Sequence, residues 1–140
     1  MGTPSYATRI FKALIDDKNF EITSVFTQPD KPSGRGNHLT PPDIKIFIQD
    51  NDINVKIFQP ESIKNDEIVE SIKSQKPDFI VVAAYGKILP LSILNIAPCI
   101  NLHASLLPKY RGASPIQYAI LNADKFTGIT AMLMEEGLDS

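Results

Sequence analysis

One segment of the chain, Phe79-Ile80-Val81-Val82-Ala83-Ala84, is an uninterrupted apolar run of strand length. A strand with apolar side chains on both faces is typical of the centre of a parallel sheet, where helices cover each face. The run therefore predicts an α/β fold in which residues 79–84 form an inner strand.

The apolar residues on either side of this run alternate between helical and strand spacing. Alternating helices and strands imply a doubly wound, mainly parallel sheet with helices on both faces. Ligands of such sheets usually bind at the carboxyl ends of the strands, where we expect Tyr85, His103 and Glu135. Residues 28–42, rich in Pro and Gly, are interpreted as a long loop. We expect helices over residues 6–15, 41–48, 68–72 and 114–123, and further strands over 22–26, 55–58, 99–103 and 129–134.

The composition is that of an ordinary globular domain. The 140 residues carry a formal net charge of −2, so contact with nucleic acid would have to come from a local patch. Cys99, the only cysteine, cannot form an internal disulfide and is expected to be a small buried side chain. The sequence has no apolar run of membrane-spanning length, and we expect a cytoplasmic protein with no membrane contact. No residues have metal-ligand spacing, so no metal is predicted.

Asn101 and His103 lie two residues apart in the expected strand over residues 99–103. At strand spacing their side chains point to the same face. An amide that donates hydrogen bonds beside an imidazole that handles protons can stabilise a carbonyl carbon passing through a charged tetrahedral intermediate. The pair therefore predicts acyl-transfer chemistry, whereas a lone strand histidine would more often be a structural residue.

Four blocks of sequence, taken together, resemble the 10-formyltetrahydrofolate-dependent formyltransferases, and within them the branch that acts on methionyl-tRNA. They occur in the family's order and cover nearly the whole chain. The blocks are Phe26-Thr27-Gln28-Pro29-Asp30-Lys31-Pro32-Ser33-Gly34-Arg35-Gly36, Ala84-Tyr85-Gly86-Lys87-Ile88-Leu89-Pro90, Asn101 to Gln117 with its Ser-Leu-Leu-Pro stretch, and Gly128 to Asp139.

The resemblance implies a Rossmann-like catalytic domain and assigns roles to particular residues. Asn101, His103 and Asp139 match the catalytic triad, with Asp139 orienting the imidazole. Lys31 and Arg35 lie in the loop that reaches the acceptor stem of the initiator tRNA. The chain departs from the family pattern after Gly36, because Asn37-His38 stands where many members carry consecutive basic residues. The residues that match the folate site are Ser105, Leu106, Leu107, Pro108, Tyr85, Gly86, Ile88 and Leu89.

The activity that the resemblance implies is formyl transfer from 10-formyltetrahydrofolate to the α-amino group of methionyl-initiator tRNA, in translation initiation. Alternatives with the same triad are a formyltransferase acting on an amino-sugar nucleotide or a glycinamide ribonucleotide, and a hydrolase that releases formate. A non-catalytic folate- or nucleotide-binding module is the alternative of another class, since a fold alone never establishes activity.

The resemblance also bears on domain organisation. Gly2-Thr3-Pro4 resembles the turn that follows the family's first strand, and Gly137-Leu138-Asp139-Ser140 resembles the start of a conserved loop. We therefore expect residues 1–140 to be a catalytic domain that is incomplete at both ends, without the family's C-terminal tRNA-binding domain. The parent protein is expected to be a monomer.

Overall fold

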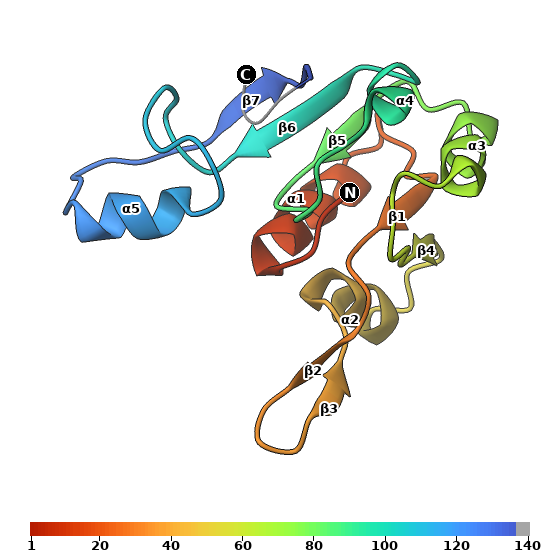
Figure 1. Ribbon diagram of the computed structural model, residues 1–140, viewed down its shortest axis with the longest axis horizontal. Coiled ribbons are helices and arrows are strands. Elements are labelled where there is room, and N and C mark those ends of the chain that lie inside the picture. The colour runs from red at the N-terminus through yellow and green to blue at the C-terminus, as the bar shows by residue number, and fades with distance from the viewer. Residues whose placement is uncertain (137–140) are drawn as a thin grey trace.

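The computed structural model describes residues 1–136 of the chain, and Figure 1 shows how its elements are arranged. Helices and strands alternate for most of the length, which confirms the α/β prediction. The elements are α1 (Ser5–Asp16), β1 (Ser24–Phe26), β2 (Lys31–Ser33), β3 (His38–Thr40), α2 (Asp43–Asp50), β4 (Lys56–Phe58), α3 (Asp66–Ser74), β5 (Ile80–Val82), α4 (Leu91–Leu94), β6 (Cys99–His103), α5 (Pro115–Leu121) and β7 (Thr130–Leu133).

The backbone of Met1 and Gly2 joins two groups of strands. β1 pairs with β4 in parallel, and β5 pairs with β6 in parallel. The Gly2 amide donates to the carbonyl of Phe26 at 3.0 Å, and the Ala83 amide donates to the carbonyl of Met1 at 2.9 Å. These bonds place residues 1–2 between β1 and β5, so the strands follow the order β4, β1, residues 1–2, β5, β6 and β7.

Helices cover both faces of this sheet, as the sequence predicts. Val25 packs with Phe11 of α1 and with Ile44 and Ile48 of α2. Its neighbour Phe26 points to the other face, because successive strand residues alternate. There it joins the larger cluster, whose buried members are Ile63, Val69, Ile72, Ile80, Val82, Tyr85, Leu89, Ile93 and Cys99. Cys99 is 1% exposed, which confirms its predicted burial.

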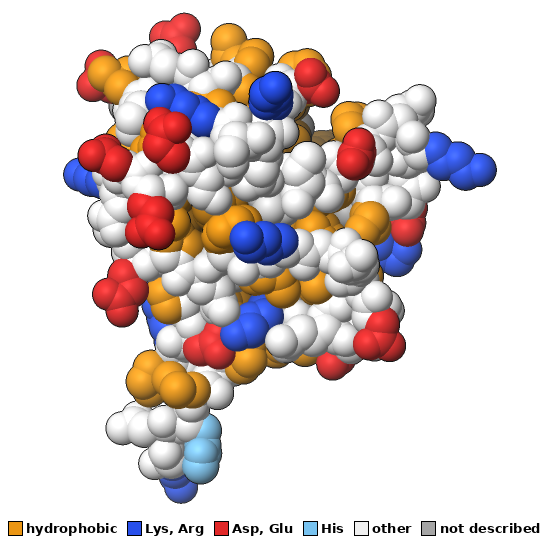
Figure 2. All heavy atoms as spheres, turned by 90° about the vertical axis from the view of Figure 1, so that its right-hand side faces the viewer, with side chains coloured by type: hydrophobic (Ala, Val, Ile, Leu, Met, Phe, Trp, Pro, Cys, Tyr) orange, Lys and Arg blue, Asp and Glu red, His pale blue; other side chains and the backbone are white. Residues whose placement is uncertain are grey.

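The structure corrects the sequence-based expectations at residues 28–42. This segment is not an irregular loop, because β2 and β3 pair antiparallel as a short hairpin. Gly34 and Asn37 adopt positive φ angles of 70° and 48° at its turn, a conformation that glycine and asparagine tolerate better than other residues. Every residue of both strands is exposed, so alternating burial could not reveal them. Figure 2 shows the hairpin projecting from the body of the molecule.

The second half of the chain differs from the expectation in four details. The inner strand is shorter than residues 79–84, and Phe79 is 57% exposed. β7 runs antiparallel to β6, with His103 opposite Thr130 and Ile100 opposite Leu133. α5 ends at Leu121, before Ala123, and its Ile120 is 72% exposed. α4 is too short to give a helical period and was not predicted.

Among residues 1–136, no helix is both long enough and apolar enough to cross a membrane.

Candidate active site

A cavity of about 670 Å³ opens beside the ends of β5 and β6. Its walls come from five places in the chain: the start of α1, the end of β5 with the loop after it, the face of β6, the turn that leads into α5, and the residues that follow β7. In Figure 1, α1, β5 and β6 lie between α5 on the left and α3 and β4 on the right. Pockets of roughly 300–1,000 Å³ with mainly apolar walls and a few polar groups are typical of small-molecule sites.

Asn101 and His103 both line this cavity from β6. They are two residues apart on one strand, so their side chains leave the same face of the sheet. Asn101 is half-buried, and His103 is 6% exposed. The structure thus brings together the two residues that the sequence analysis selected for acyl-transfer chemistry.

The imidazole of His103 is held by the turn that follows β6. Its Nε2 lies 2.8 Å from the carbonyl oxygen of Tyr110. A carbonyl can only accept, so Nε2 carries the hydrogen of this bond. The Tyr110 hydroxyl donates to Asp124 at 2.8 Å and accepts from Asn122 at 3.1 Å. The orientation of the ring is therefore tied to residues at the end of α5.

The loop after β5 forms the opposite wall and contains four predicted folate-site residues, Tyr85, Gly86, Ile88 and Leu89, all of which line the cavity. Tyr85 and Leu89 are 2% and 5% exposed and belong to the core, whereas Ile88 is 65% exposed. Gly86 has a φ of 80°, which favours glycine at this turn.

Two polar contacts fasten this loop at its start. The Tyr85 carbonyl accepts hydrogen bonds from Thr3 Oγ1 and from Gln28 Nε2, each at 3.0 Å. The Tyr85 hydroxyl has no hydrogen-bond partner among the described residues. Burial raises its pKa to about 12, so the phenol stays protonated at neutral pH.

The other predicted folate-site residues have a different neighbourhood. Within the described part of the chain, the lining of the cavity does not include Ser105, Leu106, Leu107 or Pro108. These residues turn towards β7. The amide of Leu107 donates to Thr130 Oγ1 at 3.1 Å, and that hydroxyl donates to the Ser105 carbonyl at 2.6 Å. Their role in folate binding stays a prediction.

The predicted tRNA-contacting residues, Lys31 and Arg35, are exposed on the β2–β3 hairpin. Lys31 begins β2, and Arg35 lies in the turn. The hairpin base is close enough to the cavity loop for Lys31 to help lower the pKa of Lys87, although burial is the larger cause. The Lys87 amine donates to the carbonyls of Pro60 and Glu61, at 2.5 and 2.6 Å.

Glu135 lines the same cavity. The sequence predicts Glu135 at the carboxyl end of a parallel strand, but β7, the strand that it follows, is antiparallel. Because β7 is antiparallel, Glu135 comes after its end and lies towards the beginning of β6. Asp139, the third predicted catalytic residue, falls outside the described residues.

Sequence reasoning missed several residues that line the cavity. Tyr6 begins the helix predicted over residues 6–15, and the sequence assigns it no functional role. In the structure it lines the cavity, and its hydroxyl donates to the carbonyl of Leu102 at 2.9 Å. Residues Gly112, Ala113 and Ile116 were noted only as part of a family motif. No local signal marks Tyr6, because its partner is remote in sequence. In residues 1–136, no three His, Cys, Asp or Glu residues are grouped so that they could hold a metal ion.

Comparison with known proteins gives a consistent picture. The family model described as formyl transferase matches residues 1–140. Methionyl-tRNA formyltransferases of Campylobacter lari and Campylobacter jejuni are 67% and 62% identical to the chain over 140 residues, all of this chain and 46% of each relative. The chain thus spans about half the length of the curated relatives it matches.

Solved structures share the fold at lower sequence identity. The crystal structure of phosphoribosylglycinamide formyltransferase from Bacillus halodurans superimposes with a TM-score of 0.72 at 22% identity, covering 99% of this chain and 72% of that chain. This likeness supports the Rossmann-like arrangement of the sheet and its helices.

Proposed function

This chain belongs to the formyl transferase family, and from that premise we propose that the full-length protein formylates methionyl-initiator tRNA. In this reaction the formyl group of 10-formyltetrahydrofolate passes to the α-amino group of the methionine. The proposal makes folate and charged initiator tRNA the partners of the protein, in the cytoplasm and in translation initiation. The identity of 67% to a methionyl-tRNA formyltransferase supports this acceptor over an amino sugar or a ribonucleotide.

The observation that carries the proposal is the placement of Asn101 and His103 side by side on β6, at the wall of one cavity. A formyl carbon held in front of them would develop negative charge on its oxygen when the amine attacks. The Asn101 amide can donate a hydrogen bond to that oxygen. The His103 imidazole can stabilise the same charge or take the proton that the amine loses. Asp139, by resemblance, would orient the imidazole.

The described residues favour direct attack by the amine over a covalent enzyme intermediate. Cys99 is buried, its thiol donates to the Ala97 carbonyl at 3.4 Å, and burial raises its pKa. The Ser105 hydroxyl is also buried and donates to the Lys109 carbonyl at 2.6 Å. A covalent mechanism needs a nucleophile that is activated by a base and open to substrate, and neither of these two groups meets that requirement.

The cavity and the hairpin fit the two substrates of the proposed reaction. The loop of residues 85–89 offers apolar walls and a glycine turn, which suit a flat heterocycle such as a pterin. The hairpin carries Lys31 at its base and Arg35 in its turn, both exposed, where they can contact phosphates or bases of RNA.

The test is formylation of charged initiator tRNA by the full-length protein and by its Asn101→Ala and His103→Ala variants. We expect each variant to lower kcat by about 100-fold or more, because each loses a group that acts on the transition state. Binding of tetrahydrofolate, measured by calorimetry, should change only a few-fold.

A matched control exists for the asparagine substitution. Asn19→Ala changes an exposed asparagine that lies outside the cavity lining and the hairpin, and it should keep kcat. Full turnover in Asn101→Ala and His103→Ala would contradict the assignment of the site. Release of formate without formylated tRNA would identify a hydrolase, and formylation of a small amine alone would identify another acceptor.

A further inference from the structure

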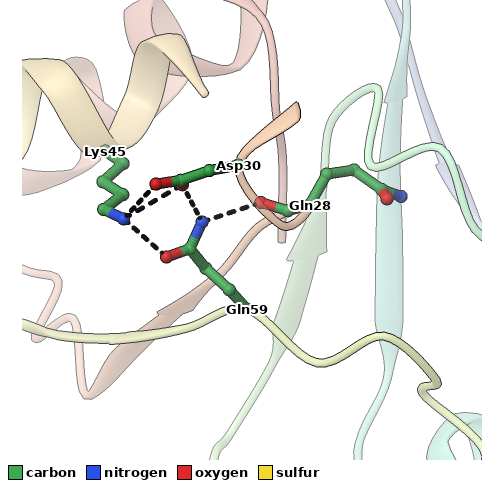
Figure 3. Close-up of polar contacts among 4 residues, drawn as sticks. All are labelled: Gln28, Asp30, Lys45 and Gln59. Carbon is green, nitrogen blue, oxygen red and sulfur yellow. Dashed lines mark hydrogen bonds and ion pairs between the residues drawn. The ribbon is translucent and has the colours of Figure 1, made fainter. Parts of the chain in front are cut away.

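Gln28, Asp30, Lys45 and Gln59 form a polar network (Figure 3) next to the base of the β2–β3 hairpin. The amine of Lys45 donates to both carboxylate oxygens of Asp30 at 3.0 Å, and to Gln59 Oε1 at 2.8 Å. The Gln59 amide in turn donates to Asp30 Oδ1 at 2.6 Å and to the Gln28 carbonyl at 3.0 Å. Each of these three side chains is therefore bonded to the other two.

The network holds both ends of the hairpin. Asp30 immediately precedes β2, and Lys45 lies in the first turn of α2, shortly after β3. Gln59 follows β4 and ties the pair to the edge of the parallel sheet. A hairpin whose strand residues are all exposed has few packing contacts of its own, so hydrogen bonds at its two ends can constrain its direction.

Gln28 carries the connection on to the cavity wall. Its backbone carbonyl accepts from Gln59, while its side chain points away from the other three residues and donates to the Tyr85 carbonyl at 3.0 Å (Figure 3). A Cβ atom on Gly86 would come within 3.2 Å of the Gln28 amide nitrogen. The side chain of Gln28 therefore lies directly against the wall formed by Tyr85 and Gly86.

The ion pair in this network is more buried than the pair on α3. The side chains of Lys45 and Asp30 are 19% and 29% exposed, whereas those of Lys73 and Glu70 on α3 are 52% and 70% exposed. Hydrogen bonds from Gln59 and Lys45 lower the pKa of Asp30, so its carboxylate stays ionised at neutral pH. Partly buried pairs with saturated hydrogen bonds hold a fixed geometry, which exposed pairs seldom do.

We infer that Gln28, Asp30, Lys45 and Gln59 form a positioning unit that fixes the β2–β3 hairpin relative to the Tyr85–Gly86 wall. An RNA acceptor held by the hairpin and a formyl donor held in the cavity are then presented to each other in a set geometry. This inference rests on the proposed function for the identity of the two substrates. The contacts that form the unit do not depend on it.

The first test is kinetic and uses the full-length protein. Lys45→Met keeps the length of the side chain but removes its charge and all three hydrogen bonds. We expect it to raise the KM for charged initiator tRNA about tenfold, since small misplacements of a reactant are costly, while the Kd for tetrahydrofolate changes less than about threefold. Lys45→Arg, which retains charge and donors, should recover the KM to within about threefold.

Lys73→Met is the matched control, because it removes a lysine from an exposed ion pair on α3. It should leave both substrates unaffected. An unchanged tRNA KM in Lys45→Met, or a loss that Lys45→Arg does not recover, would overturn the inference. If Lys45→Met fails to fold, Asp30→Asn and Gln28→Met interrupt the same unit more mildly and are measured in its place.

The second test needs no activity and separates this inference from the proposed function. Amide hydrogen exchange is followed in the full-length protein over residues 31–40 and 84–89. Lys45→Met should speed exchange in both segments, because the unit joins them. Lys73→Met should speed exchange in neither segment. If exchange becomes faster in the hairpin alone, the four residues hold only the hairpin and do not link it to the cavity wall, and the inference is overturned. If Lys45→Met speeds exchange in both segments of a protein that formylates no tRNA, the positioning unit is supported and the proposed function is rejected.

Discussion

Two buried hydroxyl groups, those of Thr27 and Tyr85, have no hydrogen-bond partner among the described residues. A buried polar group without a partner costs roughly 1–3 kcal/mol. Tyr85 has the larger side chain of the two. Its ring lies in the main core cluster, and the residue is 2% exposed. Substitutions at this residue can therefore separate the packing of the ring from the cost of its hydroxyl.

We predict that Tyr85→Phe raises the free energy of unfolding by about 1 kcal/mol at pH 7, because the ring stays and the unpaired hydroxyl goes. Urea denaturation of the full-length protein measures this. Tyr85→Ala, which removes the ring as well, should destabilise by about 3–5 kcal/mol. A Phe variant that is clearly less stable than the wild type would show that the hydroxyl has a partner in solution.

The same variant isolates a pH dependence. Burial raises the pKa of Tyr85 from 10.0 to about 12, so above pH 10 the unfolded chain ionises before the folded one. The wild type should therefore lose stability as the pH rises from 10 towards 12. Tyr85→Phe lacks this loss, so the difference in unfolding free energy between the two proteins should grow over that range. An equal pH dependence in both would contradict the assigned burial.

At the scale of the elements, α1 packs closely against the chain between β1 and β5. A Cβ atom on Gly2 would lie 2.4 Å from the Cβ of Ala7 and 2.8 Å from the carbonyl oxygen of Ala83. Both neighbours are held, one by the helix and the other by the sheet. The absence of a side chain at residue 2 therefore sets how near α1 can pack.

We predict that Gly2→Ala lowers the free energy of unfolding by about 2–3 kcal/mol, as expected for overpacking against a rigid backbone. Gly128→Ala is the control. Its added Cβ would approach only the end of the Leu106 side chain, at 2.7 Å, and Leu106 is 50% exposed and can turn aside. It should cost less than about 0.5 kcal/mol. Equal midpoints for the two variants in urea would contradict this account of the α1 packing.

At the scale of the molecule, the surface is large for its mass. The accessible area is 9177 Å² for a chain of 15.5 kDa, whereas a compact monomer of that mass exposes about 7,200 Å². Several large apolar side chains are exposed around α5 and β7. Tyr118, Ile120, Leu121, Phe126 and Leu133 are 54%, 72%, 78%, 84% and 59% exposed.

We predict that residues 1–140 expressed alone associate at micromolar concentration, because exposed apolar patches of this kind favour contact between molecules. Sedimentation velocity should show a mass above that of the monomer. The double substitution Ile120→Gln and Leu121→Gln should reduce the association. Leu39→Gln, which changes an equally exposed leucine on the hairpin, should not. A monomer in every case would contradict the prediction.

Local patterns were sufficient for much of the fold and for the centre of the site. The periods of apolar residues predicted α1, α2, α3 and the strand of residues 99–103, because each period reflects burial of one face of a single element. The placement of Asn101 and His103 on one face follows from the geometry of a strand alone. Four motifs in order indicated the family, which the comparisons confirm.

Only the tertiary structure decided how remote segments meet. The antiparallel direction of β7, which carries Glu135 towards the start of β6, depends on pairing with a strand about 30 residues earlier. The contacts of Gln28, Asp30, Lys45 and Gln59 join helix α2 to the β1–β2 and β4–α3 connections, and their residues are polar and aperiodic. Such contacts leave no period in the sequence, because they satisfy hydrogen bonds across space and do not bury the face of one element.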